Sequence, residues 1–254
     1  MSFGMTSPKP NPASPRFLLL QARNPGDPMA QHEVDCFAAA LGVPSERVNR
    51  WDLLHDVPDS RALEQTDLIL VGGSGDYSVL DDEPYIHRFL DFLADVVVAR
   101  SIPTFASCFG FQALVASGGG SMVRDPDRAE VGTFTIHLTA DGQRDLLLGD
   151  LSRSFKAQLG HKDRAERLPA GMTNLARSER ASCQALRVDG TQIVATQFHP
   201  ELTRADNAFR YKQYQASYAS SAAGDVDEVL ATLEESPEAT ALLPRWAAQA
   251  LADV

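Results

Sequence analysis

The strongest constraint on the fold is an alternation of uninterrupted apolar runs with helical patterns in the first half of the chain. The apolar runs have the length of strands and are "RFLLLQA" (16–22), "TDLILVGG" (66–73) and "IPTFAS" (102–107). Apolar residues recur at helical spacing in the intervening segments 27–42, 84–100 and 108–120. Strands that are apolar on both faces and joined through helices form parallel sheets covered on both sides. The sequence therefore predicts an α/β fold with an open, mostly parallel sheet flanked by helices on both faces.

The pattern changes after about residue 131. Period-two character appears in four short segments, "VGTFTIHLTA", "RSFKAQLGH", "SCQALRVDG" and "TQIVATQFH". Asp189–Gly190 is a hairpin signal between the last two. This predicts a partly antiparallel C-terminal part of the sheet, followed by helix from Thr203 to about Ala223. We divide the chain into a disordered N-terminal tail (1–15, rich in proline and serine), one domain (16–224) and a C-terminal helical extension (225–254).

Composition limits the partners and the compartment. The formal net charge is −11, from 34 acidic and 23 basic residues, which disfavours nucleic acid and anionic membranes as partners. No apolar run approaches the ~20 residues that span a bilayer, and the first 16 residues lack the pattern of a secretory signal. The three cysteines form neither a disulfide framework nor a zinc motif, so we expect a reduced, cytoplasmic protein.

Cys108 lies where the apolar run 102–107 changes into a helical pattern. A turn of this type exposes its residue at the carboxyl edge of a sheet, where open α/β folds place their sites. The helix N-terminus favours a thiolate, and the N–H of Phe109 is placed to face an oxyanion. Small neighbours, Ala106 and Gly110, relieve crowding there. The alternative is a buried cysteine that acts as a small hydrophobe. We interpret Cys36 and Cys183 in that second way.

A cysteine nucleophile needs a base and a group that orients the base. In "TQFHPEL", His199 precedes a proline, which favours an extended backbone. Residues i and i+2 of an extended segment point the same way, so Glu201 lies on the side of His199. The alternative is a histidine in a turn beside a solvated glutamate. Four other histidines, His32, His55, His87 and His137, have no carboxylate at ligand spacing in the sequence.

Four segments resemble the class I (triad-type) glutamine amidotransferases and occur along the chain in the order that this family shows. "SCFGFQ" (107–112) resembles their nucleophile motif G-x-C-x-G-x-Q, and "FHPE" (198–201) their His-x-Glu motif. "LILVGGSGDYSVLDD" (68–82) is similar to their glycine turn. "LGHKDRAERLP" (159–169) is similar to the SHxDxVxxLP segment of GMP-synthetase-type members. The resemblance implies the flavodoxin-like fold of that family and covers roughly residues 17–201.

The resemblance also implies a catalytic triad. Cys108 would be the nucleophile, His199 the acid and base, and Glu201 its orienting carboxylate. Around them it implies oxyanion-hole N–H groups from Gly73 and Phe109 and substrate-binding side chains from Gln112, His161 and Asp163. The implied chemistry is attack on the side-chain amide of glutamine, release of ammonia and hydrolysis of a γ-glutamyl thioester, with no metal or cofactor.

Two departures from the family pattern occur near the site. Ala106 replaces the first glycine of the nucleophile motif, and Gly160 stands where many members have serine. The second change removes a side chain that could contact the substrate.

Three functions remain open at this point. The first is a stand-alone glutamine amidotransferase-like hydrolase that supplies ammonia to a separate synthetase subunit. The second is a γ-glutamyl peptidase or γ-glutamylamine hydrolase with the same triad. The third is a non-catalytic binding or regulatory protein, against which an intact Cys108, His199 and Glu201 argue. The expected small-molecule partner is glutamine or a γ-glutamyl compound.

Overall fold

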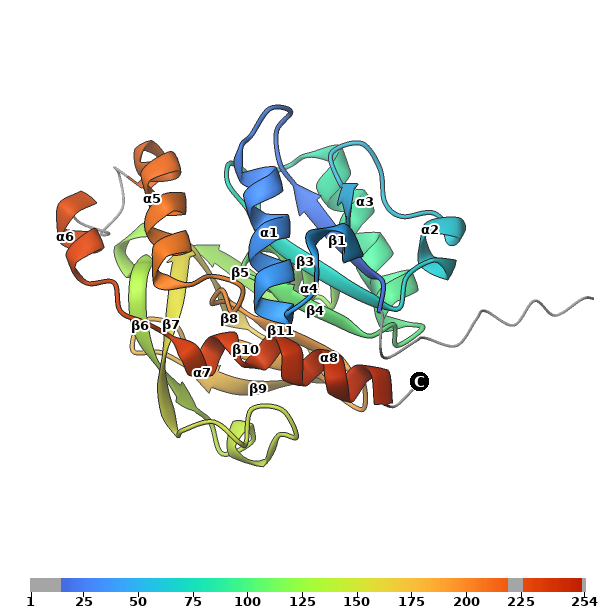
Figure 1. Cartoon of the computed structure of the whole chain (residues 1–254). Coiled ribbons are helices and arrows are strands. Elements are labelled where there is room, and N and C mark those ends of the chain that lie inside the picture. Colours follow the sequence, from blue (N-terminus) through green and yellow to red (C-terminus); the bar gives the residue numbers. More distant parts are fainter. Residues whose placement is uncertain (1–14, 219–225, 253–254) are drawn as a thin grey trace, which may run out of the picture.

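A nine-stranded sheet organises the computed structural model, which describes residues 15–218 and 226–252 (Figure 1). Its strands run in the order β2-β1-β3-β4-β11-β10-β9-β6-β7, and β5 and β8 form a separate two-stranded sheet. The strands are β1 (Phe17–Ala22), β2 (Val48–Asp52), β3 (Leu68–Ser74), β4 (Thr104–Ser107), β5 (Ser121–Arg124), β6 (Glu130–Leu138), β7 (Ser154–His161), β8 (Asp163–Arg167), β9 (Met172–Arg177), β10 (Ala185–Val188) and β11 (Ile193–Thr196).

The sheet is parallel from β2 to β11 and antiparallel beyond it. Ala106 of β4 pairs with Val71 of β3, and Ser107 pairs with Thr196 of β11, all in parallel register. The carboxyl ends of β3, β4 and β11 therefore meet at one edge of the sheet. The turn at Asp189–Gly190 joins the antiparallel strands β10 and β11, as predicted. The expected open sheet with a partly antiparallel C-terminal part is confirmed, although the sequence patterns did not predict β5, β8 or β9.

Helices cover both faces of the sheet. They are α1 (Met29–Leu41), α2 (Ser60–Glu64), α3 (Pro84–Phe92) with its π-helical continuation Leu93–Val98, α4 (Phe109–Ser117), α5 (Arg204–Tyr218), α6 (Val226–Ala231), α7 (Pro237–Thr240) and α8 (Leu242–Ala252). Short 3-10 turns occur at Ser45–Arg47, Pro126–Arg128 and Gly142–Arg144. α1 and α8 pack on one face and α3 and α4 on the other, so the sheet lies between two helical layers (Figure 1).

The two cores follow from the alternation of side chains along the strands. On the face covered by α1 and α8, the strands contribute Leu19, Leu70, Phe105 and Val194. On the face covered by α3 and α4, they contribute Leu20, Val71, Ala106 and Ala195. Because both sets are buried, the central strands carry apolar side chains on both faces, as the apolar runs of the sequence predicted.

The segment predicted as a C-terminal extension contributes to the first of these cores. Trp246 of α8 is fully buried, its ring lies edge-on to Phe105 at 5.5 Å, and its Nε1 donates to the carbonyl of Gln192 at 3.0 Å. α8 therefore covers the same sheet face as α1. The predicted tail (residues 1–14 of it) and the boundary at 224–225 lie outside the described residues.

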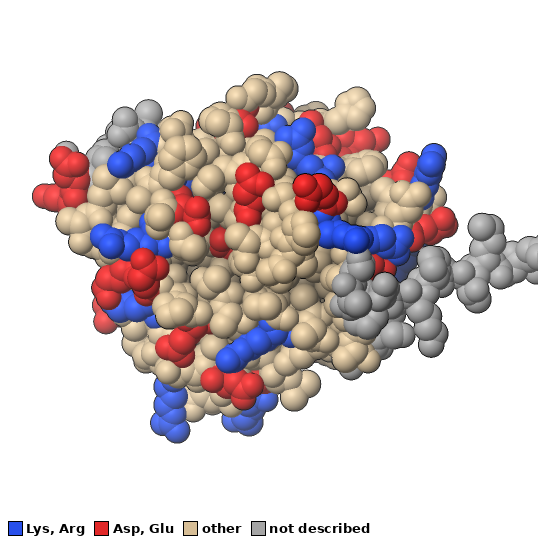
Figure 2. Space-filling model, in the orientation of Figure 1, with Lys and Arg blue, Asp and Glu red and all other residues tan. Residues whose placement is uncertain are grey.

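The surface shown in Figure 2 carries acidic and basic side chains interspersed, without a continuous basic patch on that face. Within residues 15–218 and 226–252, no helix is both long enough and apolar enough to cross a membrane.

Candidate active site

Cys108 occupies a strained turn between β4 and α4. Its backbone has φ 51° and ψ −100°, a conformation that costs a non-glycine residue about 1–3 kcal/mol. Its N–H donates to the carbonyl of Thr196, the last residue of β11, at 2.8 Å. Gly110 is required by space, since a Cβ there would lie 2.7 Å from Cβ of Val71. The local sequence thus folds into a tight elbow that holds the thiol at the edge where β4 and β11 end.

His199 and Glu201 form a buried pair just beyond the end of β11. Nδ1 of His199 lies 2.6 Å from Oε1 of Glu201, and the two side chains are 1% and 0% exposed. The His199 backbone N–H donates to the carbonyl of Gln158 at 2.8 Å, which fixes the segment. Nε2 of His199 has no hydrogen-bond partner among the described residues. Glu201 therefore holds one ring nitrogen and leaves the other for chemistry.

Opposing influences act on the pKa of His199. Burial lowers it most strongly, and the Arg210 cation lowers it further, whereas Glu201 and Cys108 raise it. The net effect raises the pKa of His199 to about 9. Its imidazole is therefore protonated at neutral pH and can both stabilise a thiolate and donate a proton.

A cavity of about 380 Å³ opens at this edge of the sheet. Its walls include Cys108, Phe109 and Gln112 together with the turn 74–78 and the segment 160–163. A larger cavity, about 630 Å³, lies at the opposite edge, where β4 and β11 begin, and is lined by Pro103, Gln192 and the Asp145–Arg187 ion pair. The smaller cavity contains the candidate nucleophile, so we take it as the substrate site.

Two buried glutamine side chains, Gln112 and Gln197, form a chain of hydrogen bonds that reaches the sulfur of Cys108. Nε2 of Gln112 donates to Oε1 of Gln197 and to the carbonyl of Asp163, both at 3.2 Å. Nε2 of Gln197 in turn lies 3.7 Å from Sγ of Cys108 and donates towards it. Gln197 was not predicted as a site residue, although it lies only two residues before His199.

The two predicted oxyanion donors differ in their present partners. Phe109 is the first residue of α4, so its N–H has no acceptor within the helix. The N–H of Gly73, by contrast, donates to Oε1 of the buried Glu33 at 2.9 Å. A Cβ on Gly73 would lie 3.1 Å from Cε1 of His199, so Gly73 is beside His199, but its N–H is directed to Glu33 of α1.

His161 and Asp163 contact each other, and each has further polar partners. The ring nitrogens of His161 contact Oε2 of Glu130 at 3.2 Å and the carbonyl of Asp163 at 3.0 Å. The Asp163 carboxylate accepts a hydrogen bond from the hydroxyl of Ser78 and lies 3.4 Å from Nε of Arg124. Both residues line the cavity.

Three charged residues near the triad were not predicted from the sequence: Arg23, Glu33 and Arg210. Glu33 lies on the apolar stripe of α1, between Ala30 and Phe37, although glutamate is almost never buried without a partner. A charge within that stripe was the available signal. Arg210 of α5 had no such signal, because the groups that it contacts lie on other elements.

One cluster offers possible metal ligands. His32, Cys36 and Asp206 place one ligand atom each within 4.8 Å of one another. Burial and the nearby carboxylates raise the pKa of the Cys36 thiol far above its ordinary value. A metal binds the thiolate rather than the thiol, so a metal bound at this cluster would have to displace the thiol proton.

Comparisons by sequence and by fold both match this chain to glutamine amidotransferases. The family model of glutamine amidotransferase class-I matches residues 38–212. A subunit of the glutamine-hydrolysing GMP synthase of Sulfolobus acidocaldarius is 33% identical over 144 residues, which cover 57% of this chain and 72% of that protein. A glutamine-hydrolysing GMP synthase of Thermosipho melanesiensis is 32% identical over 154 residues, covering 60% of this chain. The matched segment spans only 27% of that longer protein.

Solved structures share the architecture at low sequence identity. A glutamine amidotransferase from Thermotoga maritima superposes with a TM-score of 0.72 at 19% identity, covering 95% of this chain and 99% of that one. A glutamine amidotransferase from Methylobacillus flagellatus gives a TM-score of 0.67 at 21% identity, covering 94% and 93%.

Proposed function

This chain belongs to the class-I glutamine amidotransferase family, and on that premise we propose that it hydrolyses the side-chain amide of glutamine with Cys108, His199 and Glu201 as a triad. The observation that carries the proposal is the buried His199–Glu201 pair, 2.6 Å apart, next to a cysteine in a strained elbow. The N–H of Cys108 donates a hydrogen bond to Thr196 at the end of β11. Cys108 and His199 therefore follow the ends of two neighbouring strands, β4 and β11.

In the first half of the reaction, the Cys108 thiolate attacks the side-chain carbonyl carbon of glutamine. The tetrahedral oxyanion accepts a hydrogen bond from the N–H of Phe109. The carbon–nitrogen bond then breaks, and Nε2 of His199 gives its proton to the leaving nitrogen. Ammonia departs, and a γ-glutamyl thioester remains on Cys108. The raised pKa of His199 supports this role, because it keeps the ring protonated at neutral pH.

In the second half, neutral His199 takes a proton from water as the water oxygen attacks the thioester carbonyl. The carbon–sulfur bond breaks, glutamate leaves, and the thiolate is restored beside protonated His199. Glu201 holds Nδ1 throughout, so the ring keeps one orientation in both proton transfers.

The second oxyanion donor requires a local rearrangement. The Gly73 N–H is bonded to Glu33 in this conformation. We propose that Phe109 supplies the hydrogen bond first, and that the peptide of Gly73 contributes after it rotates away from Glu33.

For substrate binding we propose Gln112 and Asp163, whose side chains reach the cavity near Cys108. His161 has a contact at each ring nitrogen, so we propose that it supports the Asp163 segment from behind. The similarity to a separate GMP synthase subunit supports a proposal about the fate of the ammonia. Its acceptor would be held by a synthetase subunit encoded as another chain.

The test uses the isolated chain and an electrophilic glutamine analogue, 6-diazo-5-oxo-L-norleucine. Peptide mapping should find one adduct, on Cys108, and Cys108→Ser should lose both the adduct and ammonia release from glutamine. Labelling of Cys36 or Cys183 with Cys108 untouched would refute the triad. Because coupled amidotransferases can be slow alone, kcat/KM is compared with that for γ-glutamyl amides. A preference of a hundredfold or more for a bulky amide, ~3 kcal/mol of transition-state binding, would show a γ-glutamylamine hydrolase instead.

A further inference from the structure

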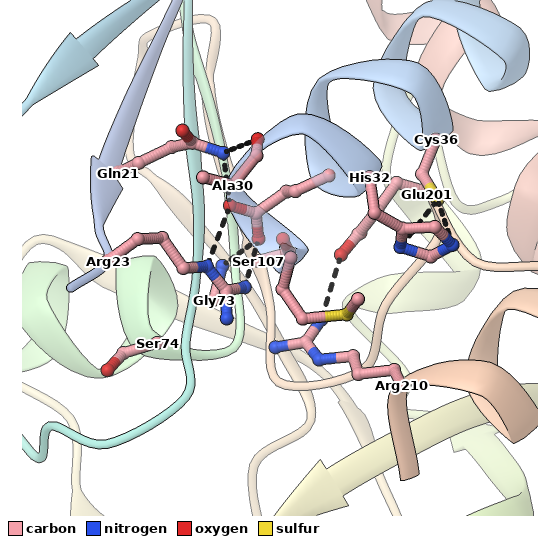
Figure 3. Close-up of polar contacts among 12 residues, drawn as sticks. Gln21, Arg23, Ala30, His32, Cys36, Gly73, Ser74, Ser107, Glu201 and Arg210 are labelled. Atoms are coloured by element: carbon pink, nitrogen blue, oxygen red, sulfur yellow. Dashed lines mark hydrogen bonds and ion pairs between the residues drawn. The ribbon is translucent and has the colours of Figure 1, made fainter. Parts of the chain in front are cut away.

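A buried line of charge runs from the end of β1 through α1 to α5, and Figure 3 labels its two arginines, Arg23 and Arg210. It consists of Arg23, Glu33 and Arg210, which are 6%, 3% and 8% exposed. Nη2 of Arg23 lies 2.9 Å from Oε1 of Glu33, whose Oε2 accepts from Gln21 at 2.7 Å. Burial raises the pKa of Glu33, but the Arg23 and Arg210 cations outweigh it and lower the pKa, so the carboxylate is ionised.

The glycine turn (Gly72–Gly75), which includes the last residues of β3, passes through this line of charge. A Cβ on Gly72 would lie 2.6 Å from the Glu33 carboxylate. A Cβ on Gly73 would lie 2.4 Å from Nη2 of Arg210 and 3.1 Å from Cε1 of His199. The two glycines therefore let Glu33 and Arg210 approach the turn closely from either side, and Glu33 attracts Arg210 across it.

α5 is fixed next to the same turn. One helical turn after Arg210, the hydroxyl of Tyr214 accepts from Nη1 of Arg23 at 2.7 Å and donates to Asp27 at 2.6 Å. A Cβ on Gly75 would lie 2.4 Å from Cζ of Tyr214. These contacts leave the Arg210 guanidinium little freedom to move away from the triad.

Arg210 lies against the acid–base pair itself. Its Nη1 is 3.3 Å from Nδ1 of His199 and 3.9 Å from Oε1 of Glu201. Because the N–H at Nδ1 donates a hydrogen bond to Glu201, the guanidinium faces that nitrogen as a cation and not as a hydrogen-bond donor. The charged or titratable groups facing His199 are Glu201, Cys108 and Arg210, with Glu33 behind Gly73. After burial, Arg210 is the next influence that lowers the pKa of His199.

We propose that Arg210 is a positioning residue of the acid–base pair: it holds the Glu201 carboxylate in line with His199 and sets the upper pH limit of the reaction. The inference rests on the proposed role of His199 as proton donor. At high pH the reaction stops when His199 loses its proton, and the adjacent cation makes that loss easier. Without Arg210, His199 keeps its proton to higher pH, but its orienting carboxylate is less well held.

The experiment measures kcat/KM from pH 6 to 10.5 for the full chain. In Arg210→Met the descending limb should move up by on the order of one pH unit, about tenfold in proton affinity, while the maximum rate falls. Arg210→Lys keeps the charge but not the planar fork, so its limb should stay near that of the unmodified protein. Arg210→Gln is a second neutral variant, used if Arg210→Met does not fold.

Arg187→Met is the matched control, because it removes a guanidinium held by Asp145 at 2.6 and 3.0 Å at the far edge of the sheet. It should leave the descending limb in place. The inference is overturned if the descending limb of the pH profile stays in place or moves to lower pH in Arg210→Met and Arg210→Gln. It is also overturned if the limb moves to higher pH by the same amount in Arg210→Lys.

An NMR titration of the His199 ring separates this inference from the proposed function, since it needs no turnover. An unmodified chain that neither hydrolyses γ-glutamyl amides nor labels at Cys108 refutes the proposed function. Even then, the pKa of His199 measured by NMR should be higher in Arg210→Met than in the unmodified chain. If it is not, the inference about Arg210 is refuted independently of the proposed function.

Discussion

Replacing Glu201 with glutamine removes the charge that keeps His199 protonated while preserving the shape of the side chain. The carboxylate lies 2.6 Å from Nδ1 and is buried, so no solvent screens the interaction. Without it, burial and the Arg210 cation both act to lower the pKa of His199, and only Cys108 still raises it. We therefore expect the pKa to fall from about 9 to no higher than its ordinary value of ~6.5.

The magnitude follows from these values. At pH 7.5, roughly 97% of His199 is protonated when its pKa is about 9. About a tenth remains protonated at a pKa of ~6.5. Proton donation alone should therefore fall about tenfold, equivalent to ~1.4 kcal/mol in the barrier. Loss of the orienting charge adds to this, so the total loss in turnover at pH 7.5 should exceed tenfold.

The assay is the pH profile of kcat/KM for the best substrate, with Asp145→Asn as the control for losing a buried, paired carboxylate far from the site. In Glu201→Gln the descending limb should move to lower pH, opposite to the direction expected for Arg210→Met. The control should keep its limb. Turnover within twofold of the unmodified protein at pH 7.5, with the limb still near pH 9, would refute the reasoning.

Three further changes test the site and the fold. His199→Ala should lower turnover by roughly 10²–10⁴-fold, the range of general acid–base catalysis; near-normal turnover would exclude it as acid and base. Trp246→Ala should lower the free energy of unfolding by about 3–5 kcal/mol, measured by urea denaturation, because its ring is fully buried against the sheet; a change below about 1 kcal/mol would mean that α8 is not docked. Burial raises the pKa of Asp145, but its bonds to Arg187 outweigh this and lower it. Its contribution to stability is therefore present above the unfolded pKa of ~3.9 and is lost as pH falls through the lower folded pKa. Melting temperatures between pH 6 and 3 should show a smaller acid loss for Asp145→Asn, and equal slopes would contradict this.

Features that depend on neighbours in the chain could be predicted from the amino-acid order alone. Continuous apolar runs predicted strands buried on both faces, and Leu19 and Leu20 do pack into different cores. The Asp-Gly pair predicted the β10–β11 turn. The spacing of His199 and Glu201 predicted that both side chains lie on one side of an extended segment. The two side chains do meet, 2.6 Å apart, but residues 200–201 form a turn, in which the N–H of Leu202 donates to the carbonyl of His199 at 3.3 Å. Each of these follows from local geometry, in which residue spacing sets the direction of a side chain.

The meeting of separate elements at the site could not be predicted in this way. The carboxylate of Glu33 accepts a hydrogen bond from the N–H of Gly73, and the guanidinium of Arg210 lies against His199. Both contacts arise because α1 and α5 pack on either side of the same glycine turn. The stripe of α1 marks Glu33 as unusual, but no local pattern identifies Gly73, 40 residues later, as its partner. Spacing along the chain sets only the direction in which a side chain leaves its own element. The contacts that it then makes depend on how separate elements pack, and that packing is set by the burial of the whole chain at once.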